Sequence, residues 1–310
     1  MNQIKTTPKD FFLHLGATIA LYIGVVSIIN LYFSIINYYF PDVLAGSFYA
    51  PSMAWPISIL IVVVPILYVL EWMVKKDIKL NPDKAEVWVR KWRIYLTLFL
   101  AGVVMAVDLI ALINTYLNGE ISIRFVYKFI IVLLVLAIVF VYYILEKLGK
   151  SVKLKSALAY IGIIISILAI VLGFMVVGSP TKQRNIRFDN QRVSDLQNIQ
   201  WQIVNHWQQK SKLPTDLKET IDLISGTKIP TDPSTKADYE YRIKNASTNT
   251  FELCAVFSLK TQDNKGRGEF YDSVSTSYYP GFDNDSWNHE SGRVCFERTI
   301  DPDKYPKLLK

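Results

Sequence analysis

Histidine and cysteine are scarce in this chain, which has three histidines and two cysteines among its 310 residues. His14, His206 and His289 lie far apart in the sequence, so their spacing supports neither a metal-binding cluster nor a nucleophilic triad. The chain also lacks a phosphate-binding loop, a dinucleotide-binding fingerprint and the two-histidine helix of zinc proteases. We therefore predict a protein that is not an enzyme and that holds no cofactor, apart from a calcium alternative discussed below.

Charged residues are nearly missing from five long apolar stretches, in which Asp108 and Lys128 are the only ones. A membrane-spanning helix needs about 20 mostly apolar residues, because the hydrocarbon offers no partner to an open backbone N–H or C=O group. The stretches cover residues 11–40, 54–70, 94–117, 125–145 and 157–177. The pattern predicts a multi-pass α-helical bundle with five transmembrane helices, surrounded by a lipid bilayer.

Lysine and arginine fall almost entirely on alternate connections between these stretches. The N-terminal tail and the second and fourth connections together carry thirteen, whereas the other side carries only Arg124 and Lys128. Basic loops favour the cytoplasmic side of a membrane, so we predict a cytoplasmic N-terminus and, after five crossings, an extracytoplasmic segment 180–310. Residues 1–179 hold +6 of the net charge of +7, so the basicity follows from topology and gives no support for nucleic-acid binding.

Three regions follow from this pattern: a four-helix membrane domain over residues 1–150, a fifth helix and anchor over 151–179, and an extracytoplasmic domain over 180–310. In the last region, apolar residues recur at helical spacing and predict one long helix. They are Val193, Leu196, Ile199, Ile203 and Trp207. A short second helix is expected over 215–225. Alternating residues predict a strand over 239–243, and β-rich composition predicts strands over 250–258 and 293–300. The domain should therefore be of the α+β class, with a helix and a small antiparallel sheet.

The two cysteines, Cys254 and Cys295, fall in the second and third of these strands. Outside the cytoplasm a disulfide can persist, and neighbouring strands can bring the two residues together, so we predict a Cys254–Cys295 disulfide. The alternative is a pair of buried, unpaired thiols. A metal site made from two lone cysteines is less favoured.

The N-terminal part resembles a bacterial membrane family known as domain of unknown function 5671, from residue 11 to about residue 145. The resemblance rests on the tract Arg90-Lys91-Trp92-Arg93-Ile94-Tyr95-Leu96, on Asp108, and on Asn118-Gly119-Glu120 before Arg124-Phe125. The family has no assigned activity. It implies a bacterial plasma membrane as the location, with this chain as a multi-pass protein.

The C-terminal part resembles the globular region of type IV pilin and type II secretion pseudopilin subunits. The residues that carry this resemblance are Asp189 to Arg192, Asp195-Leu196, Ile199, Trp207, Leu213-Pro214, Leu217, Pro230-Thr231-Asp232-Pro233 and Tyr239-Glu240-Tyr241. The family implies a helix packed on an antiparallel sheet. Because this chain has no pilin processing site and its span is the fifth rather than the first, we expect a pilin-like domain on a fixed anchor.

Two polar positions stand out within the predicted spans. Asp108 lies about ten residues from the outer end of its span, and Lys128 on the following helix is the expected counter-charge. An ionisable group at such depth usually faces a partner or a water-filled cavity. The functional interpretation is an ion or proton path, and the structural alternative is a polar pair that locks the bundle.

A late loop concentrates oxygen-bearing side chains that could serve as calcium ligands. These are Asp283, Asp285, Asn288 and Glu290. Calcium prefers about six to eight oxygen ligands, and some pseudopilins that this region resembles bind calcium in a late loop. The alternative is a solvated turn, because Asp and Asn are also common turn residues.

Taken together, the sequence predicts a non-enzymatic membrane protein that presents a pilin-like domain to an envelope or secretion-related partner, or to further copies of itself. Candidate contact residues are the aromatics Phe270, Tyr271, Tyr278, Tyr279, Phe282 and Trp287. The alternative function is a small transporter or channel subunit with Asp108 on the path.

Overall fold

The computed structural model describes residues 6–40, 53–119, 121–149, 152–221, 226, 228–261 and 287–306. The chain divides into two compact units, Met1–Val177 and Gly178–Lys310. We call them the helical unit and the C-terminal unit.

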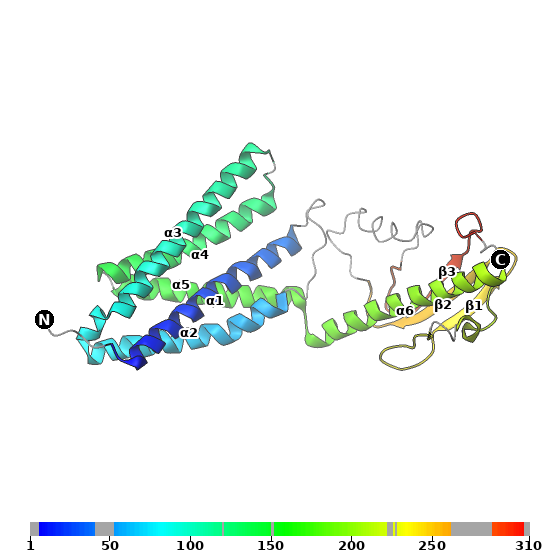
Figure 1. Ribbon diagram of the computed structural model, residues 1–310, viewed down its shortest axis with the longest axis horizontal. Coiled ribbons are helices and arrows are strands. Elements are labelled where there is room, and N and C mark those ends of the chain that lie inside the picture. The colour runs from blue at the N-terminus through cyan, green and yellow to red at the C-terminus, as the bar shows by residue number, and fades with distance from the viewer. Residues whose placement is uncertain are drawn as a thin grey trace. The chain divides into compact units, whose positions relative to one another are not determined.

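The helical unit consists of long apolar helices, which Figure 1 shows as coiled ribbons. They are α1 (Pro8–Tyr39), α2 (Ala54–Leu80), α3 (Trp88–Leu117), α4 (Ile123–Leu148) and α5 (Val152–Val177). A short 3-10 helix, η3 (Pro82–Glu86), connects α2 to α3. Among the described residues, five helices are long and apolar enough to cross a membrane, so the architecture is compatible with a multi-pass membrane protein. The five predicted stretches are confirmed as helices.

Local sequence signals explain where these helices begin and end. Thr7 caps α1 in a reciprocal capping box with Asp10, and the Ser122 side chain caps α4. Gly149 ends α4 in the left-handed conformation, with a φ of 62°, which glycine adopts without a steric penalty. Pro65 lies inside α2, where neighbouring helices can compensate for the lost hydrogen bond.

Helix α1 is the centre of the helical unit, because it contacts each of the other four long helices. The buried cluster around it includes Leu31, Leu60 and Ala169, all with no exposed surface. Gly173 allows α5 to approach this cluster closely. A Cβ atom at this position would lie 2.9 Å from Cδ1 of Ile57 and 3.1 Å from Cδ1 of Leu31.

The C-terminal unit combines one long helix, α6 (Pro180–Lys210), with a three-stranded antiparallel sheet. The strands are β1 (Glu240–Asn245), β2 (Thr250–Phe257) and β3 (Gly292–Thr299), in the order β1-β2-β3. Figure 1 shows α6 running along the sheet. The predicted long helix and three strands are confirmed.

The core of the C-terminal unit lies between α6 and one face of the sheet. The apolar stripe of α6 supplies Leu196, Ile199, Ile203 and Trp207, which meet Phe251, Leu253, Ala255 and Phe257 of β2. Burying one such side chain stabilises the fold by about 1.5–3 kcal/mol relative to leaving it exposed. Val193, the first residue of the predicted stripe, packs at the margin of this cluster and is only partly buried.

The predicted helix over 215–225 was wrong within the residues that the structure describes. The segment contains only a 3-10 helix, η4 (Leu217–Thr220), and Ile221 is already extended. The Asp216 side chain accepts a hydrogen bond from the backbone N–H of Lys218, and the Thr215 hydroxyl donates to Glu219. These bonds cap the start of η4, and the chain leaves the helical conformation at Ile221.

Candidate functional site

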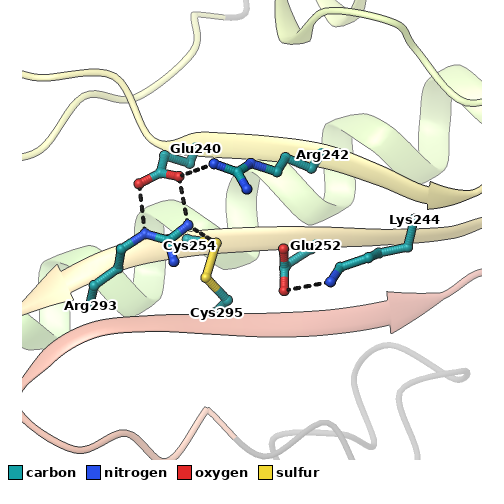
Figure 2. Close-up of a disulfide and its surroundings, with 7 residues drawn as sticks. All are labelled: Glu240, Arg242, Lys244, Glu252, Cys254, Arg293 and Cys295. Carbon is teal, nitrogen blue, oxygen red and sulfur yellow. Dashed lines mark hydrogen bonds and ion pairs between the residues drawn. A yellow bond between two sulfur atoms is a disulfide. The ribbon is translucent and has the colours of Figure 1, made fainter.

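The outer face of the sheet, opposite α6, carries the Cys254–Cys295 disulfide. The register places Cys254 of β2 directly opposite Cys295 of β3, with their Cα atoms 4.0 Å apart. Figure 2 shows the bond lying on the face of the two strands. Because side chains alternate along a strand, the residues two positions away point to this same face.

Ion pairs between the strands surround the disulfide, and one of them crosses the central strand β2 to join β3 to β1 (Figure 2). The Arg293 guanidinium binds the Glu240 carboxylate through two bonds, from Nε to Oε1 at 2.9 Å and from Nη2 to Oε2 at 2.7 Å. This hydrogen bonding from Arg293 lowers the pKa of Glu240 below its ordinary value. Lys244 pairs with Glu252 at 3.3 Å. The face is therefore polar and charged, with the disulfide in its middle.

The two sulfur atoms have different surroundings. Cys254 is 1% exposed, whereas Cys295 is partly exposed. Nη2 of Arg293 lies 3.4 Å from Sγ of Cys254 and donates a hydrogen bond to it. Glu252 brings a carboxylate oxygen within 4.8 Å of both sulfurs, a spacing that suits a metal ion. Because both sulfurs are bonded to each other, this trio offers no pair of thiolate ligands while the disulfide is intact.

A buried polar network fixes the position of α6 in the C-terminal unit. Arg192 of α6 pairs with Asp189 at 2.7 Å and with Asp232 at 2.6 Å, and all three side chains are largely shielded from solvent. Asp189 accepts hydrogen bonds from the backbone N–H groups of Ser258 and Leu259, just beyond β2. The network therefore joins the helix, the Pro230–Pro233 segment and the end of the central strand.

Asp232 is the most strongly perturbed acid of this network. Burial raises its pKa, but hydrogen bonds from Arg192, Thr235 and Ser234 outweigh that effect and hold the pKa well below its usual range. Nearby, the Tyr239 hydroxyl donates to Asp195 at 2.7 Å, and burial together with this bond raises the pKa of Tyr239. Such satisfied networks favour one arrangement of the elements they connect.

Sequence reasoning singled out Asp189, Arg192 and Asp232 only as parts of a family resemblance and did not predict their pairing. Their residue types were the signal that could have predicted a buried ion pair, because an arginine and an aspartate on an otherwise apolar helix face require partners. Forty residues separate Arg192 from Asp232, so no local spacing reveals the contact.

In the helical unit, Asp108 and Lys128 lie on α3 and α4, but the ion pairs among the described residues do not join them. Nζ of Lys128 lies 5.4 Å from the centre of the Phe33 ring on α1, so this side chain faces a different helix. Oδ2 of Asp108 is buried without a hydrogen-bond partner. The pairing of Lys128 with Asp108 stays a prediction.

A second set of charged residues, which the sequence reasoning missed, lies toward one end of the helical unit. Arg93 of α3, only 5% exposed, pairs with Glu71 of α2 at 2.9 Å. Glu146 of α4 binds both Arg90 of α3 and Lys155 of α5. Another group joins Lys84 to Asp10 at 2.9 Å and to Asp77 at 2.6 Å. These pairs tie all five helices together where the apolar stretches end.

Two of the four predicted calcium ligands, Asp283 and Asp285, lie outside the described residues. Of the other two, Glu290 forms an ion pair with Lys260 at 2.6 Å.

Among the predicted contact aromatics only Trp287 is described. It packs at the core with its ring 4.7 Å from that of Phe296 and beneath the Arg298 guanidinium, so it serves packing.

Comparison with known proteins places part of this chain in context. Residues 10–145 match a family described as "Domain of unknown function (DUF5671)", which supports the N-terminal resemblance. The match ends within α4, so it leaves out α5 and the whole C-terminal unit. No curated protein and no solved structure matches the chain.

Proposed function

We propose that this protein is a non-enzymatic membrane protein of the bacterial envelope, in which the helical unit anchors the C-terminal unit outside the cytoplasm. There the C-terminal unit, a pilin-like domain, binds a partner of the envelope or of a secretion or pilus machinery. The observation that carries the proposal is the Cys254–Cys295 disulfide on a separate compact unit that follows five apolar helices. Disulfides of this kind persist in oxidising compartments.

The alternation of basic residues supports the orientation. With the N-terminus in the cytoplasm and five crossings, residues 180–310 reach the outer side of the plasma membrane. The Cys254–Cys295 disulfide fits this location, because the cytosol would keep the two thiols reduced.

The surface that we assign to partner binding is the outer sheet face together with the edge of β1. Residues of β1 are largely exposed, and no strand lies beyond it among the described residues. An exposed edge can accept an additional strand from a partner, and the charges of Glu240, Arg242 and Lys244 would select that partner. The same charges discourage nonspecific pairing of edges.

Two experiments on the full-length protein test this proposal. An epitope at the C-terminus should be removed by protease added to cells whose outer barrier has been opened but whose plasma membrane is intact. An epitope at the N-terminus is the matched control and should be cut only after lysis. Protection of the C-terminal epitope until lysis would overturn the orientation.

Partner binding is tested by co-purification after crosslinking in cells. Arg242→Glu changes the charge of the exposed edge strand and should reduce recovery of specific crosslinked proteins by at least tenfold. Lys228→Glu alters an exposed lysine outside the sheet and should leave recovery unchanged. Equal recovery from both variants, or no specific crosslink at all, would contradict the assigned surface.

Asp108 supports a second candidate function, a transporter or channel subunit. Its buried, unpartnered Oδ2 atom within an apolar helix is the specific observation, since such groups often line ion paths. In reconstituted vesicles, Asp108→Asn should abolish ion or proton flux while leaving partner recovery intact. If the wild-type protein moves no ion, this second function is rejected.

A further inference from the structure

The disulfide joins a partly exposed cysteine to a buried one whose sulfur accepts a hydrogen bond from a cation. Cys295 is partly exposed, whereas Cys254 is 1% exposed. Arg293 donates from Nη2 to Sγ of Cys254 over 3.4 Å. An arginine beside a sulfur stabilises the thiolate form, which makes that sulfur the better leaving group in exchange chemistry.

The position of the two cysteines in the sheet also distinguishes them. Cys254 lies in the central strand, and its register partner on the β1 side is Glu240. An incoming thiolate approaches along the line of the S–S bond, so attack on Cys254 would come from above β1, where the Arg293–Glu240 ion pair lies and Cys254 is buried. Cys295 lies in β3, and no strand follows β3 among the described residues. Attack on Cys295 therefore comes from the β3 side of the described sheet.

We propose that Cys254–Cys295 is a site of thiol–disulfide exchange, in which an external thiolate attacks Sγ of Cys295 and Cys254 is the leaving group. The bond between the two cysteines breaks, and a new disulfide forms between the external sulfur and Cys295. The electron pair of the broken bond remains on Sγ of Cys254, where the N–H group of Arg293 stabilises the charge. A second external thiolate then attacks the first external sulfur, which releases an external disulfide and leaves Cys295 reduced.

Glu240 acts as a positioning residue for this step. Its two bonds to Nε and Nη2 hold the Arg293 guanidinium flat against the sheet, as Figure 2 shows. The same Nη2 atom reaches Cys254, so the cation is already in place before the bond breaks. The exchange also leaves the strands paired, because eight residue pairs hold β2 to β3.

The first test uses the intact wild-type protein, purified in detergent with its disulfide formed. The protein is incubated with reduced glutathione at neutral pH, quenched with an alkylating reagent and digested, and the mixed disulfide is located by mass spectrometry. Glutathione is expected on Cys295, with Cys254 alkylated. Glutathione mainly on Cys254 would overturn the proposal, and so would a disulfide that reacts only after denaturation.

The second test compares two variants that differ in whether the cation reaches the sulfur. Arg293→Gln removes the bond to Cys254 and should slow the exchange roughly three- to tenfold, by raising the pKa of the leaving thiol. Lys228→Gln is the control, because Lys228 is an exposed cation that lies outside the sheet. It should react at the wild-type rate. Equal rates for the two variants would remove Arg293 from the mechanism.

A third arm distinguishes a small thiol from a protein as the source of the thiolate. The same assay is run with a reduced oxidoreductase that carries a Cys-X-X-Cys motif, at matched thiolate concentration. A faster reaction with this protein supports exchange with a protein cysteine on the β3 side of the described sheet. An equal rate supports exchange with a small thiol, and no reaction with either reagent overturns the proposal.

Discussion

Arg192 and Asp232 are joined by two hydrogen bonds across forty residues of sequence. Nε of Arg192 donates to Oδ2 of Asp232 over 2.6 Å, and Nη2 donates to Oδ1 over 3.3 Å. The same carboxylate accepts hydrogen bonds from the backbone N–H groups of Ser234 and Thr235. A single aspartate therefore closes the turn before β1 and attaches that turn to α6.

Removing the arginine should destabilise the C-terminal unit. Arg192→Met would leave Asp189 and Asp232 buried without a cation, and loss of one partner of a buried pair typically costs about 3–5 kcal/mol. We therefore expect the unfolding temperature of this unit to fall. It can be measured from the loss of protease resistance on heating. Arg242→Met removes an exposed pair and should change the free energy of unfolding by less than about 1 kcal/mol. Similar losses in the two variants would mean that the buried network is not stabilising.

The same network predicts a pH dependence of stability. Because the pKa of Asp232 is lower in the folded than in the unfolded chain, the unfolded state binds more protons on acidification. The stabilising effect is complete above the unfolded pKa of about 4 and is lost as the pH falls below it. The melting temperature of the C-terminal unit should therefore be lower at pH 3 than at pH 5, two values that lie roughly on either side of that pKa.

Asp232→Asn is the control for this pH effect. The amide does not titrate in this range, so the variant should be less stable at neutral pH but should lose less stability on acidification. If the wild-type protein and Asp232→Asn have parallel pH profiles, Asp232 is not the titrating group.

Periodicity predicted most of the fold. The five apolar stretches and the stripe from Leu196 to Trp207 appeared as helices, because their burial follows directly from residue spacing. The cysteines lie on adjacent strands, as the β-rich composition of those two segments indicated. The failure at 215–225 arose where Asp216 and Thr215 bond locally to the chain, since side-chain bonds of this kind leave no periodic signal.

The candidate site was less predictable than the fold. The pairing of Cys254 with Cys295 could be inferred from their number and strand positions, but the contact from Arg293 depends on register. Lys128 was assigned to Asp108 because the two lie on successive helices, and the contact of Lys128 with Phe33 depends on how α4 is rotated. Helix rotation and strand register are tertiary properties, so a single sequence constrains them weakly.

The disulfide should make a large contribution to the stability of the C-terminal unit. The two cysteines are 41 residues apart, and for a loop of this size the chain-entropy account gives a stabilisation of about 4 kcal/mol. The double variant Cys254→Ser with Cys295→Ser should therefore unfold at a lower denaturant concentration than the oxidised protein. It should match the wild-type protein measured under reducing conditions. A double variant as stable as the oxidised protein would show that the cross-link does not stabilise the fold.

Close packing at Gly173 predicts a size limit for α5. A Cβ atom there would lie 2.9 Å from Cδ1 of Ile57, at the end of a side chain that can move, so Gly173→Ala should be tolerated with a small loss. Gly173→Leu adds three further carbons against the same cluster, and overpacking of this kind costs typically 1–3 kcal/mol. Gly162 lies on the same helix with nothing within 4 Å of its added Cβ, so Gly162→Leu is the matched control. In detergent, Gly173→Leu should lower the melting temperature of the helical unit and Gly162→Leu should not. The opposite ranking, or no difference between the two, would mean that α5 does not pack against α1 and α2 through Gly173.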